Sequence, residues 1–213
     1  MTKIIVLAAG KGHRMNCDLP KVLFPINNKP MIEYLVKSIL DSGVDSNPVL
    51  VVSPDNKDMI SESLRKYSLN FALQAEQLGT GHAVLSAKHL ISEGVENIMV
   101  LYGDHPFITS ESIKRLLEGH KSEVSMMMVK VEDFLDWRKN FYHWGRIIVN
   151  EDCIEKIVEF KDASDEIKEV KDVNPALFCF NKNWLWENIA KLKNENNQKE
   201  YYLTDLIKIA FDQ

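Results

Sequence analysis

The sequence has 213 residues, of which 45% are hydrophobic, and its 26 basic and 31 acidic side chains give a formal net charge of −5. This length and apolar content exclude a disulfide-dependent miniprotein and a disordered chain. The negative charge argues against a nucleic-acid partner, because nucleic-acid binding needs a basic surface.

Strands and helices alternate over about the first 120 residues. Short apolar runs predict strands at residues 3–7, 49–52, 71–73 and 98–102. Apolar residues at helical spacing predict a helix from Met31 that Gly43 ends, and further helices at residues 57–67, 82–92 and 111–121, the last capped by Thr109 or Ser110. Three prolines make residues 11–29 a long predicted loop. This alternation predicts an α/β fold with an open, mostly parallel sheet.

The pattern becomes less regular after residue 121. We expect strands at residues 124–131, 146–149, 154–160 and 177–180, of which the middle two form a hairpin around the turn at 150–152. Helices are expected at residues 183–192 and 203–211. The methionines at 126–128 are expected in a strand core, and the charged residues 162–172 in a solvated hairpin or loop. No linker is evident, so we expect one domain.

The cysteines and the apolar runs indicate the compartment. Cys17, Cys153 and Cys179 lie far apart with no CxxC pair, which argues against a structural zinc site or a disulfide framework. No apolar stretch approaches the ~20 residues of a membrane span, and the N-terminus lacks a signal-peptide core. We expect a cytoplasmic protein with no membrane partner.

The segment LAAGKGHRM, residues 7–15, follows the first predicted strand. Its glycines let backbone N–H groups approach an anion, while Lys11, Arg14 and the nearby Lys21 supply positive charge. Met15 stands where a dinucleotide-binding fingerprint has its third glycine, and Walker A spacing is absent. The segment indicates a phosphate-binding loop, with a flexible surface turn as the alternative.

Two further segments follow predicted strands. Asp104 comes at the end of a buried strand, where ligands of open α/β sheets bind, and its carboxylate suits Mg²⁺; a turn aspartate is the alternative. Gln74 opens the segment QAEQLGTG, and its amide both donates and accepts, which suits the edge of a base. A turn that leads into a helix is the alternative for this segment.

Eight segments occur in an order that resembles a known family. They are LAAGKGHRM, LPKVL, QAEQLGTGHA, LYGDHPFIT, WGRII, IVEFKDAS, DVNPALF and EYYLTDLI. From residue 3 to about 210 the sequence resembles the sugar-1-phosphate nucleotidyltransferases, most closely the N-terminal pyrophosphorylase (uridylyltransferase) domain of N-acetylglucosamine-1-phosphate uridylyltransferase. The resemblance implies a Rossmann-like sheet flanked by helices, of the nucleotide-diphospho-sugar transferase type, with a smaller mixed β-rich sugar-binding lobe. It divides the single domain, residues 1–213, into a nucleotide-binding half, about 1–121, and a sugar-phosphate-binding half, about 122–213.

The resemblance also implies an Mg²⁺-dependent reaction between a nucleoside triphosphate and a sugar 1-phosphate. The sugar 1-phosphate attacks the α-phosphorus and pyrophosphate leaves, which requires positioning and charge neutralisation. UTP and N-acetylglucosamine 1-phosphate are the expected substrates, with another triphosphate or hexosamine 1-phosphate as the alternative. A catalytically weak nucleotide-sugar-binding protein is a second alternative. The oligomeric state stays open.

The family's functional residues transfer position by position. The nucleotide is expected against Leu7, Ala8, Gly10 and Gly12, with its base read by Gln74, Gly79 and Thr80. Arg14, Lys21 and Asp104 are the expected catalytic residues, and Asp104 is the expected Mg²⁺ ligand. The sugar phosphate is expected to contact Gly145, Glu159, Asn174, Tyr202 and Thr204.

The sequence departs from the family at four places. His13 stands where the family has Thr or Ser, and Trp144 where it has Tyr. Pro175 and Ala176 replace Thr-Gly after the asparagine; proline removes a backbone donor, and alanine adopts positive φ less readily than glycine. The family's second metal ligand, an asparagine, lies beyond Gln213. We therefore expect one of three outcomes: phosphates and water complete the Mg²⁺ shell, another residue replaces the asparagine, or activity is weak. The acetyltransferase domain is also absent from this sequence, so acetyl transfer is not expected.

Overall fold

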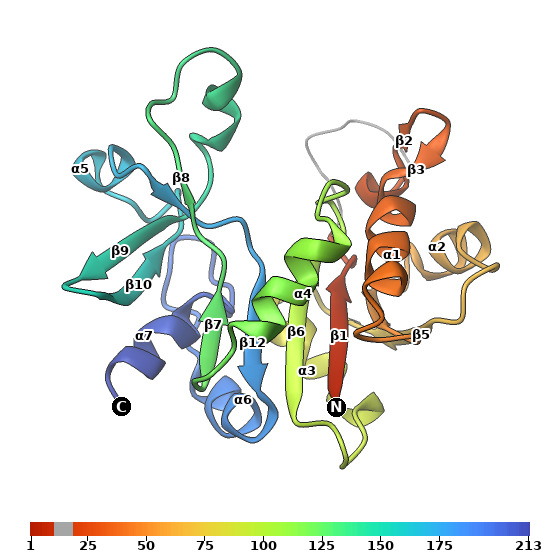
Figure 1. The fold of residues 1–213 in the computed structure, drawn as a ribbon. Coiled ribbons are helices and arrows are strands. Elements are labelled where there is room, and N and C mark those ends of the chain that lie inside the picture. The colour runs from red at the N-terminus through yellow and green to blue at the C-terminus, as the bar shows by residue number, and fades with distance from the viewer. Residues whose placement is uncertain (11–18) are drawn as a thin grey trace.

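The computed structural model describes residues 1–10 and 19–213, and its largest element is a six-stranded sheet of order β5-β4-β1-β6-β12-β7 (Figure 1). Four neighbouring strands run parallel: β1 (Thr2–Leu7), β4 (Val49–Val52), β5 (Asn70–Leu73) and β6 (Asn97–Tyr102). β12 (Phe178–Asn181) pairs antiparallel with β6 and with β7 (Val124–Met126). The predicted mostly parallel α/β sheet is therefore confirmed.

Helices cover both faces of this sheet because its strands carry apolar side chains on both sides. On β1, Ile4 and Val6 face one cluster and Ile5 faces the other. The first cluster includes residues of α1 (Met31–Ser42), α2 (Lys57–Ser63) and α4 (Ser110–Glu118). The second includes residues of α3 (Thr80–Ser86), α6 (Lys182–Asn188) and α7 (Asp205–Phe211).

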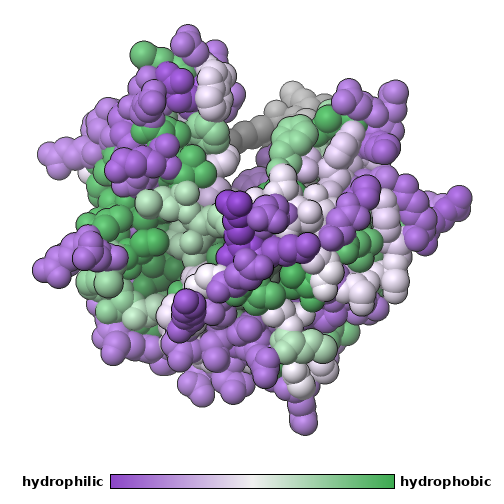
Figure 2. All heavy atoms as spheres, in the orientation of Figure 1, coloured by the Kyte–Doolittle hydropathy of each residue, from purple (hydrophilic) through white to green (hydrophobic). Residues whose placement is uncertain are grey.

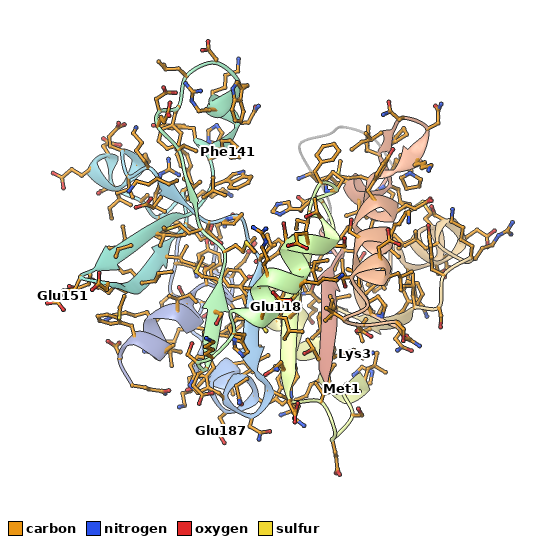
Figure 3. The ribbon with its side chains drawn as sticks, in the orientation of Figure 1. Met1, Lys3, Glu118, Phe141, Glu151 and Glu187 are labelled. Carbon is orange, nitrogen blue, oxygen red and sulfur yellow. The ribbon has the colours of Figure 1, made fainter. Side chains whose placement is uncertain are left out.

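A smaller antiparallel sheet lies beside the large one (Figure 1). Its order is β10 (Cys153–Val158), β9 (Arg146–Asn150), β11 (Asp172–Val173) and β8 (Val129–Lys130), with α5 (Asp165–Lys168) before β11. Glu151, labelled in Figure 3, lies in the tight turn of the predicted β9–β10 hairpin. The chain passes between the two sheets twice, from β7 to β8 and from β11 to β12, so residues after 121 contribute to both sheets.

Arg146 organises the smaller sheet from its interior, although its side chain is fully buried. Its guanidinium donates hydrogen bonds to the backbone carbonyls of Lys168, Tyr142 and Trp144. It also lies 4.8 Å from the centroid of the Phe134 ring. Burial lowers the pKa of Arg146. These contacts assign the arginine of WGRII a structural role.

Several local predictions were wrong in detail. In the predicted loop 11–29, the described residues form a 3₁₀ helix, η2 (Lys21–Leu23), and a hairpin of β2 (Pro25–Ile26) and β3 (Lys29–Pro30). Asn27 and Asn28 both adopt positive φ, 48° and 62°, and such pairs form two-residue hairpin turns. This asparagine pair was a readable turn signal.

The predicted strand 124–131 is two strands in different sheets, β7 and β8, because the chain changes sheets at residues 127–128. Met128 is exposed there, so the methionine run is not wholly strand core. The charged residues 162–172, predicted as a hairpin or loop, contain α5 and end in β11, which pairs with β8 and β9.

Helix ends also differ from the predicted ranges. α2 ends at Ser63, and the helices expected at 82–92 and 183–192 finish as 3₁₀ turns, η3 (Lys88–Leu90) and η5 (Ile189–Lys191). η4 (Asp136–Phe141) lies in a segment for which no element was expected. The end of α1 and the start of α4 are confirmed, since Gly43 closes α1 at φ 69° and Thr109 caps α4, but α4 ends at Glu118, before the predicted residue 121. None of the described helices is long and apolar enough to cross a membrane.

Candidate functional site

The candidate residues of the first half gather at one edge of the large sheet. Leu7 ends β1, Gln74 follows β5, and Asp104 comes two residues after β6. Because these strands are parallel, their carboxyl ends lie at the same edge, where open α/β sheets bind ligands. Met1 and Lys3, labelled in Figure 3, mark the opposite end of β1. In the space-filling view the surface is notched between the smaller sheet and the part that carries α1 (Figure 2).

Two buried or half-buried amides hold the chain where it leaves β1. Asn56 Nδ2 donates to the carbonyl of Ala8 at 2.9 Å, and Gln77 Nε2 donates to the carbonyl of Ala9 at 2.7 Å. Gly10 is exposed, and among the described residues a Cβ there would meet no atom within 4 Å. Sequence reasoning missed Asn56 and Gln77, although Gln77 lies within the segment QAEQLGTG.

Six residues named in the sequence analysis lie outside the described residues. These are Lys11, Gly12, His13, Arg14, Met15 and Cys17. The roles expected for Gly12 and Arg14 stay predictions.

Lys21 and Asp104 form an ion pair at the carboxyl edge. Lys21 Nζ donates to Asp104 Oδ2 at 2.6 Å, and the two side chains are 45% and 28% exposed. Burial raises the pKa of Asp104, but the charges of His105 and Lys21 and the Lys21 hydrogen bond outweigh it, and the pKa is lowered. The carboxylate is therefore held ionised beside a lysine. Gly103 lets this turn pass close to β1, since a Cβ there would lie 3.0 Å from the carbonyl oxygen of Leu7.

Asp104 fits the expected metal. Within the described residues no three His, Cys, Asp or Glu side chains gather as a metal site, and at this edge those residues offer the ionised carboxylate of Asp104. Mg²⁺ prefers oxygen ligands and often takes only one or two carboxylates, with substrate phosphates and water completing its shell. One carboxylate at a phosphate-binding edge suits that ion.

The predicted base-reading loop, residues 74–81, packs closely against the segment EYYLTD, residues 200–205. Gln74, only 3% exposed, donates from Nε2 to the carbonyl of Gly79 at 3.1 Å, and the same atom lies 3.2 Å from His82 Nδ1. Gly79 has φ 112°, and a Cβ there would lie 2.7 Å from both the N and the O of Tyr201. Gly81 donates its N–H to the carbonyl of Tyr201 at 2.8 Å. Both glycines are needed because the loop lies directly against this segment.

Thr80 uses its hydroxyl within the protein. Its Oγ1 accepts from the backbone N–H of Leu203 at 2.9 Å, a residue 123 positions later. Burial raises the pKa of Tyr102, and the nearby Thr80 side chain opposes this rise. The Thr80 side chain therefore joins this loop to the segment EYYLTD.

Glu159, Thr204 and Gly145 meet on the sugar side of the site. Thr204, 2% exposed, donates from Oγ1 to Glu159 Oε1 at 3.0 Å. A Cβ on Gly145 would lie 3.4 Å from Glu159 Oε2. Burial raises the pKa of Glu159, and nearby acidic groups add to this, whereas the Thr204 hydrogen bond opposes it. The Thr204 hydroxyl therefore holds the Glu159 carboxylate in place and favours its ionised form.

Asn174 lies beside Gly145. Its backbone N–H donates to the carbonyl of Gly145 at 2.9 Å, and its Oδ1 accepts from the N–H of Ala176 at 2.8 Å. Ala176 has φ 57°, so the position where the family has glycine does require the left-handed conformation. Tyr202 is buried, and its hydroxyl accepts from Gln198 Nε2 at 2.7 Å. Tyr202 and Thr204 thus support the site wall from within the protein.

Comparison with known proteins identifies the family of this chain. Residues 4–204 match the family described as the MobA-like NTP transferase domain. The bifunctional protein GlmU of Caldicellulosiruptor saccharolyticus is 39% identical over 206 residues, which are 96% of this chain and 43% of that protein. GlmU of Desulfotalea psychrophila is 36% identical over 211 residues, 97% of this chain and 60% of that protein. The chain thus spans about half the length of these curated relatives.

The fold itself is shared with a solved enzyme. The crystal structure of a UDP-glucose pyrophosphorylase complexed with UDP-glucose superposes with a TM-score of 0.76 at 20% identity, and the match covers 100% of this chain and 88% of that one. At this identity the likeness establishes the fold.

Proposed function

The chain belongs to the MobA-like NTP transferase family, and we propose that it transfers a uridylyl group from UTP to N-acetylglucosamine 1-phosphate. The observation that carries this proposal is the Lys21–Asp104 ion pair at the carboxyl edge of the parallel sheet. That edge offers both a cation for phosphate oxygens and a carboxylate for a metal ion, which nucleotidyl transfer requires. The bifunctional GlmU relatives support the choice of substrates.

In the proposed reaction, a phosphate oxygen of the sugar 1-phosphate forms a bond to the α-phosphorus. The bond from the α-phosphorus to the oxygen bridging to the β-phosphate breaks, and its electron pair leaves with pyrophosphate. No covalent bond to the protein forms. The protein's task is to align the two phosphates and neutralise their charge.

Lys21 and Asp104 separate when the triphosphate binds. Lys21 exchanges the Asp104 carboxylate for phosphate oxygens, to which an ammonium group binds as a compact charge. Asp104, freed from the lysine, would hold Mg²⁺, which when bound supplies positive charge to the phosphate oxygens. Arg14, by family resemblance, adds a second cation for the triphosphate.

The remaining site residues select the two substrates. Both contacts of Gln74 use Nε2, so we propose that Oε1 accepts from a base N–H such as that of uracil. The loop backbone at Gly79 and Thr80 and the turn at Leu7, Ala8 and Gly10 line the nucleotide. On the other side, Glu159 accepts from a sugar hydroxyl and Asn174 donates from Nδ2, while Gly145 leaves space beside Glu159.

This assignment gives each half of the domain one task. We propose that residues 1–121 make most of the nucleotide contacts and residues 122–213 most of the sugar-phosphate contacts. We also propose a cytoplasmic location, which suits the free thiols of the described cysteines Cys153 and Cys179.

The deciding experiment measures pyrophosphate release with Mg²⁺ over a grid of four nucleoside triphosphates and several sugar 1-phosphates. We expect the strongest signal with UTP and N-acetylglucosamine 1-phosphate, and its loss when EDTA removes the metal. A signal in another cell of the grid would keep the reaction and correct the substrates. Silence throughout, with nucleotide still binding in calorimetry, would instead favour a nucleotide-sugar-binding protein.

Gln74→Ala tests how the base is read. We expect this variant to lose its preference among the four triphosphates, because the selective acceptor is removed. Unchanged selectivity and rate would remove Gln74 from the proposed site.

A further inference from the structure

Three rings form a continuous stack across the boundary between the two sheets. The His105 ring lies between those of Tyr102 and Trp144, with centroids 5.9 Å and 5.8 Å away and interplanar angles of 22° and 12°. Tyr102 ends β6 of the large sheet, and Trp144 lies two residues before β9 of the smaller sheet. A single imidazole therefore connects the two sheets at the candidate site.

Each ring also contacts a part of that site. Tyr102 pairs with Leu7, the last residue of β1. His105 Nε2 lies 3.7 Å from Asp104 Oδ1, and the backbone of Pro175 raises the pKa of the ring against the larger, lowering effect of burial. Trp144 immediately precedes Gly145. The stack thus joins the nucleotide side to both segments of the sugar-side wall.

The smaller sheet supports the far end of the stack. The Trp144 ring meets the Phe141 ring edge-on, with centroids 4.7 Å apart and planes at 85°. Phe141 is the last residue of η4 and is labelled in Figure 3. The Trp144 carbonyl accepts from the buried Arg146. Phe141 and Arg146 thus fix Trp144 relative to the smaller sheet. The His105 ring, which stacks on Trp144, therefore couples the position of that sheet to the end of β6.

We propose that His105 is a positioning residue that sets the spacing between Asp104 and the wall carrying Gly145 and Asn174, and thereby controls affinity for the acceptor sugar phosphate. This inference rests on the proposed function. Gln74 follows β5, which β4 and β1 separate from β6, whereas Gly145 directly follows Trp144 of the stack. We therefore expect removal of the ring to weaken acceptor binding more than nucleotide binding.

Three variants separate the ring from its N–H group. His105→Val removes the stack, His105→Phe keeps a flat ring without the N–H donor, and His105→Asn keeps a donor without the ring. We expect His105→Val to raise KM for the acceptor about 3- to 10-fold, the size of the His105–Trp144 pair that joins the two sheets. KM for the triphosphate should stay within about 2-fold, and His105→Phe should restore most of the loss if stacking sets the spacing.

His120 supplies a matched control because it is a half-buried histidine away from the site. Its Nδ1 lies 2.9 Å from Ser125 Oγ, beside β7. His120→Val should lower the melting temperature without raising either KM. A double-mutant cycle of His105→Val and Trp144→Ala in kcat/KM for the acceptor should be strongly non-additive, since both changes remove the same contact.

The outcomes distinguish this inference from the proposed function. An acceptor-specific KM effect that His105→Phe rescues supports the positioning role. Three results would overturn the positioning role: equal effects of His105→Val on both KM values, effects no different from those of His120→Val, or an additive double-mutant cycle. In each case turnover by the wild-type protein would still support the proposed function. An inactive wild-type protein over the whole substrate grid overturns both.

Discussion

Lys21 Nζ lies 2.6 Å from Asp104 Oδ2, so two residues 83 positions apart neutralise each other at the edge where phosphate is expected to bind. Both side chains are partly exposed, and such a pair contributes at most about 1 kcal/mol to stability. A contribution to stability therefore explains this pair poorly. The proposed binding of phosphate by Lys21 and of a metal ion by Asp104 explains it better.

Lys21→Met should abolish most turnover without unfolding the protein. Loss of one charge-stabilising group typically lowers kcat by about 10²- to 10³-fold, while the melting temperature should change little. Steady-state pyrophosphate release and thermal unfolding measure the two effects. Lys37→Met is the matched control, since Lys37 forms an exposed ion pair with Asp41 on α1. Equal losses in both variants would contradict the assignment.

Thr204→Val should raise the pH below which acceptor binding weakens. The Thr204 hydroxyl stabilises the ionised form of Glu159, so its removal raises further the already raised pKa of that carboxyl. Less of Glu159 is then ionised at a given acidic pH. The measurement is acceptor KM against pH, with Thr204→Ser as the control that keeps the hydroxyl. An identical pH dependence in all three proteins would show that Glu159 does not govern acceptor binding.

Gly79→Ala should destabilise the base loop. A methyl group there would lie 2.7 Å from backbone atoms of Tyr201, and φ is 112°. Strain and displacement together should cost about 2–4 kcal/mol and weaken nucleotide binding. Gly94→Ala is the control, because a Cβ at Gly94 meets nothing within 4 Å. Denaturant unfolding and nucleotide titration test the pair, and similar stabilities for the two variants would refute the argument.

Asp205→Asn should stabilise the protein above pH 6. Burial, with the charge of Asp162, raises the pKa of Asp205 from 3.8 to about 6. The folded protein thus binds this proton more tightly than the unfolded chain, so the contribution is present below about pH 4 and lost as pH rises through 6. Asparagine removes the cost of burying the charge, and we expect a gain of about 1 kcal/mol at pH 8. Unfolding measured at pH 4 and pH 8 should show the gain only at the higher pH; Asp152→Asn, in an exposed turn, is the control.

Arg146→Lys should destabilise the smaller sheet. Lysine lacks the planar fork that reaches the carbonyls of Lys168, Tyr142 and Trp144 together. Unfilled buried hydrogen bonds should cost about 2–4 kcal/mol in the free energy of unfolding. Arg115→Lys, on the exposed face of α4, should stay within about 0.5 kcal/mol. If Arg146→Lys lowered the free energy of unfolding by no more than Arg115→Lys does, the buried hydrogen bonds of Arg146 would not stabilise this sheet.

The sequence by itself determined the elements whose cause is local. Buried strands such as β1 and β6 are short apolar runs that end at glycine or at Gly-Asp, and their parallel order places Leu7, Gln74 and Asp104 at one edge. Gly43 and Thr109 ended and began helices as predicted, because a positive φ and an N-cap are properties of single residues. The ordered motifs added the family.

Tertiary structure alone decided how distant segments complete the site. Gly79 is held by Tyr201, Thr80 by Leu203 and Glu159 by Thr204, contacts between residues at least 45 positions apart. The sequence marked Tyr202 and Thr204 as sugar contacts, whereas both are buried and direct their hydroxyls to protein partners. The strand expected at 124–131 divides between two sheets for the same reason. Periodicity and turn signals report on neighbours along the chain, whereas these arrangements depend on which surfaces meet when the two sheets pack.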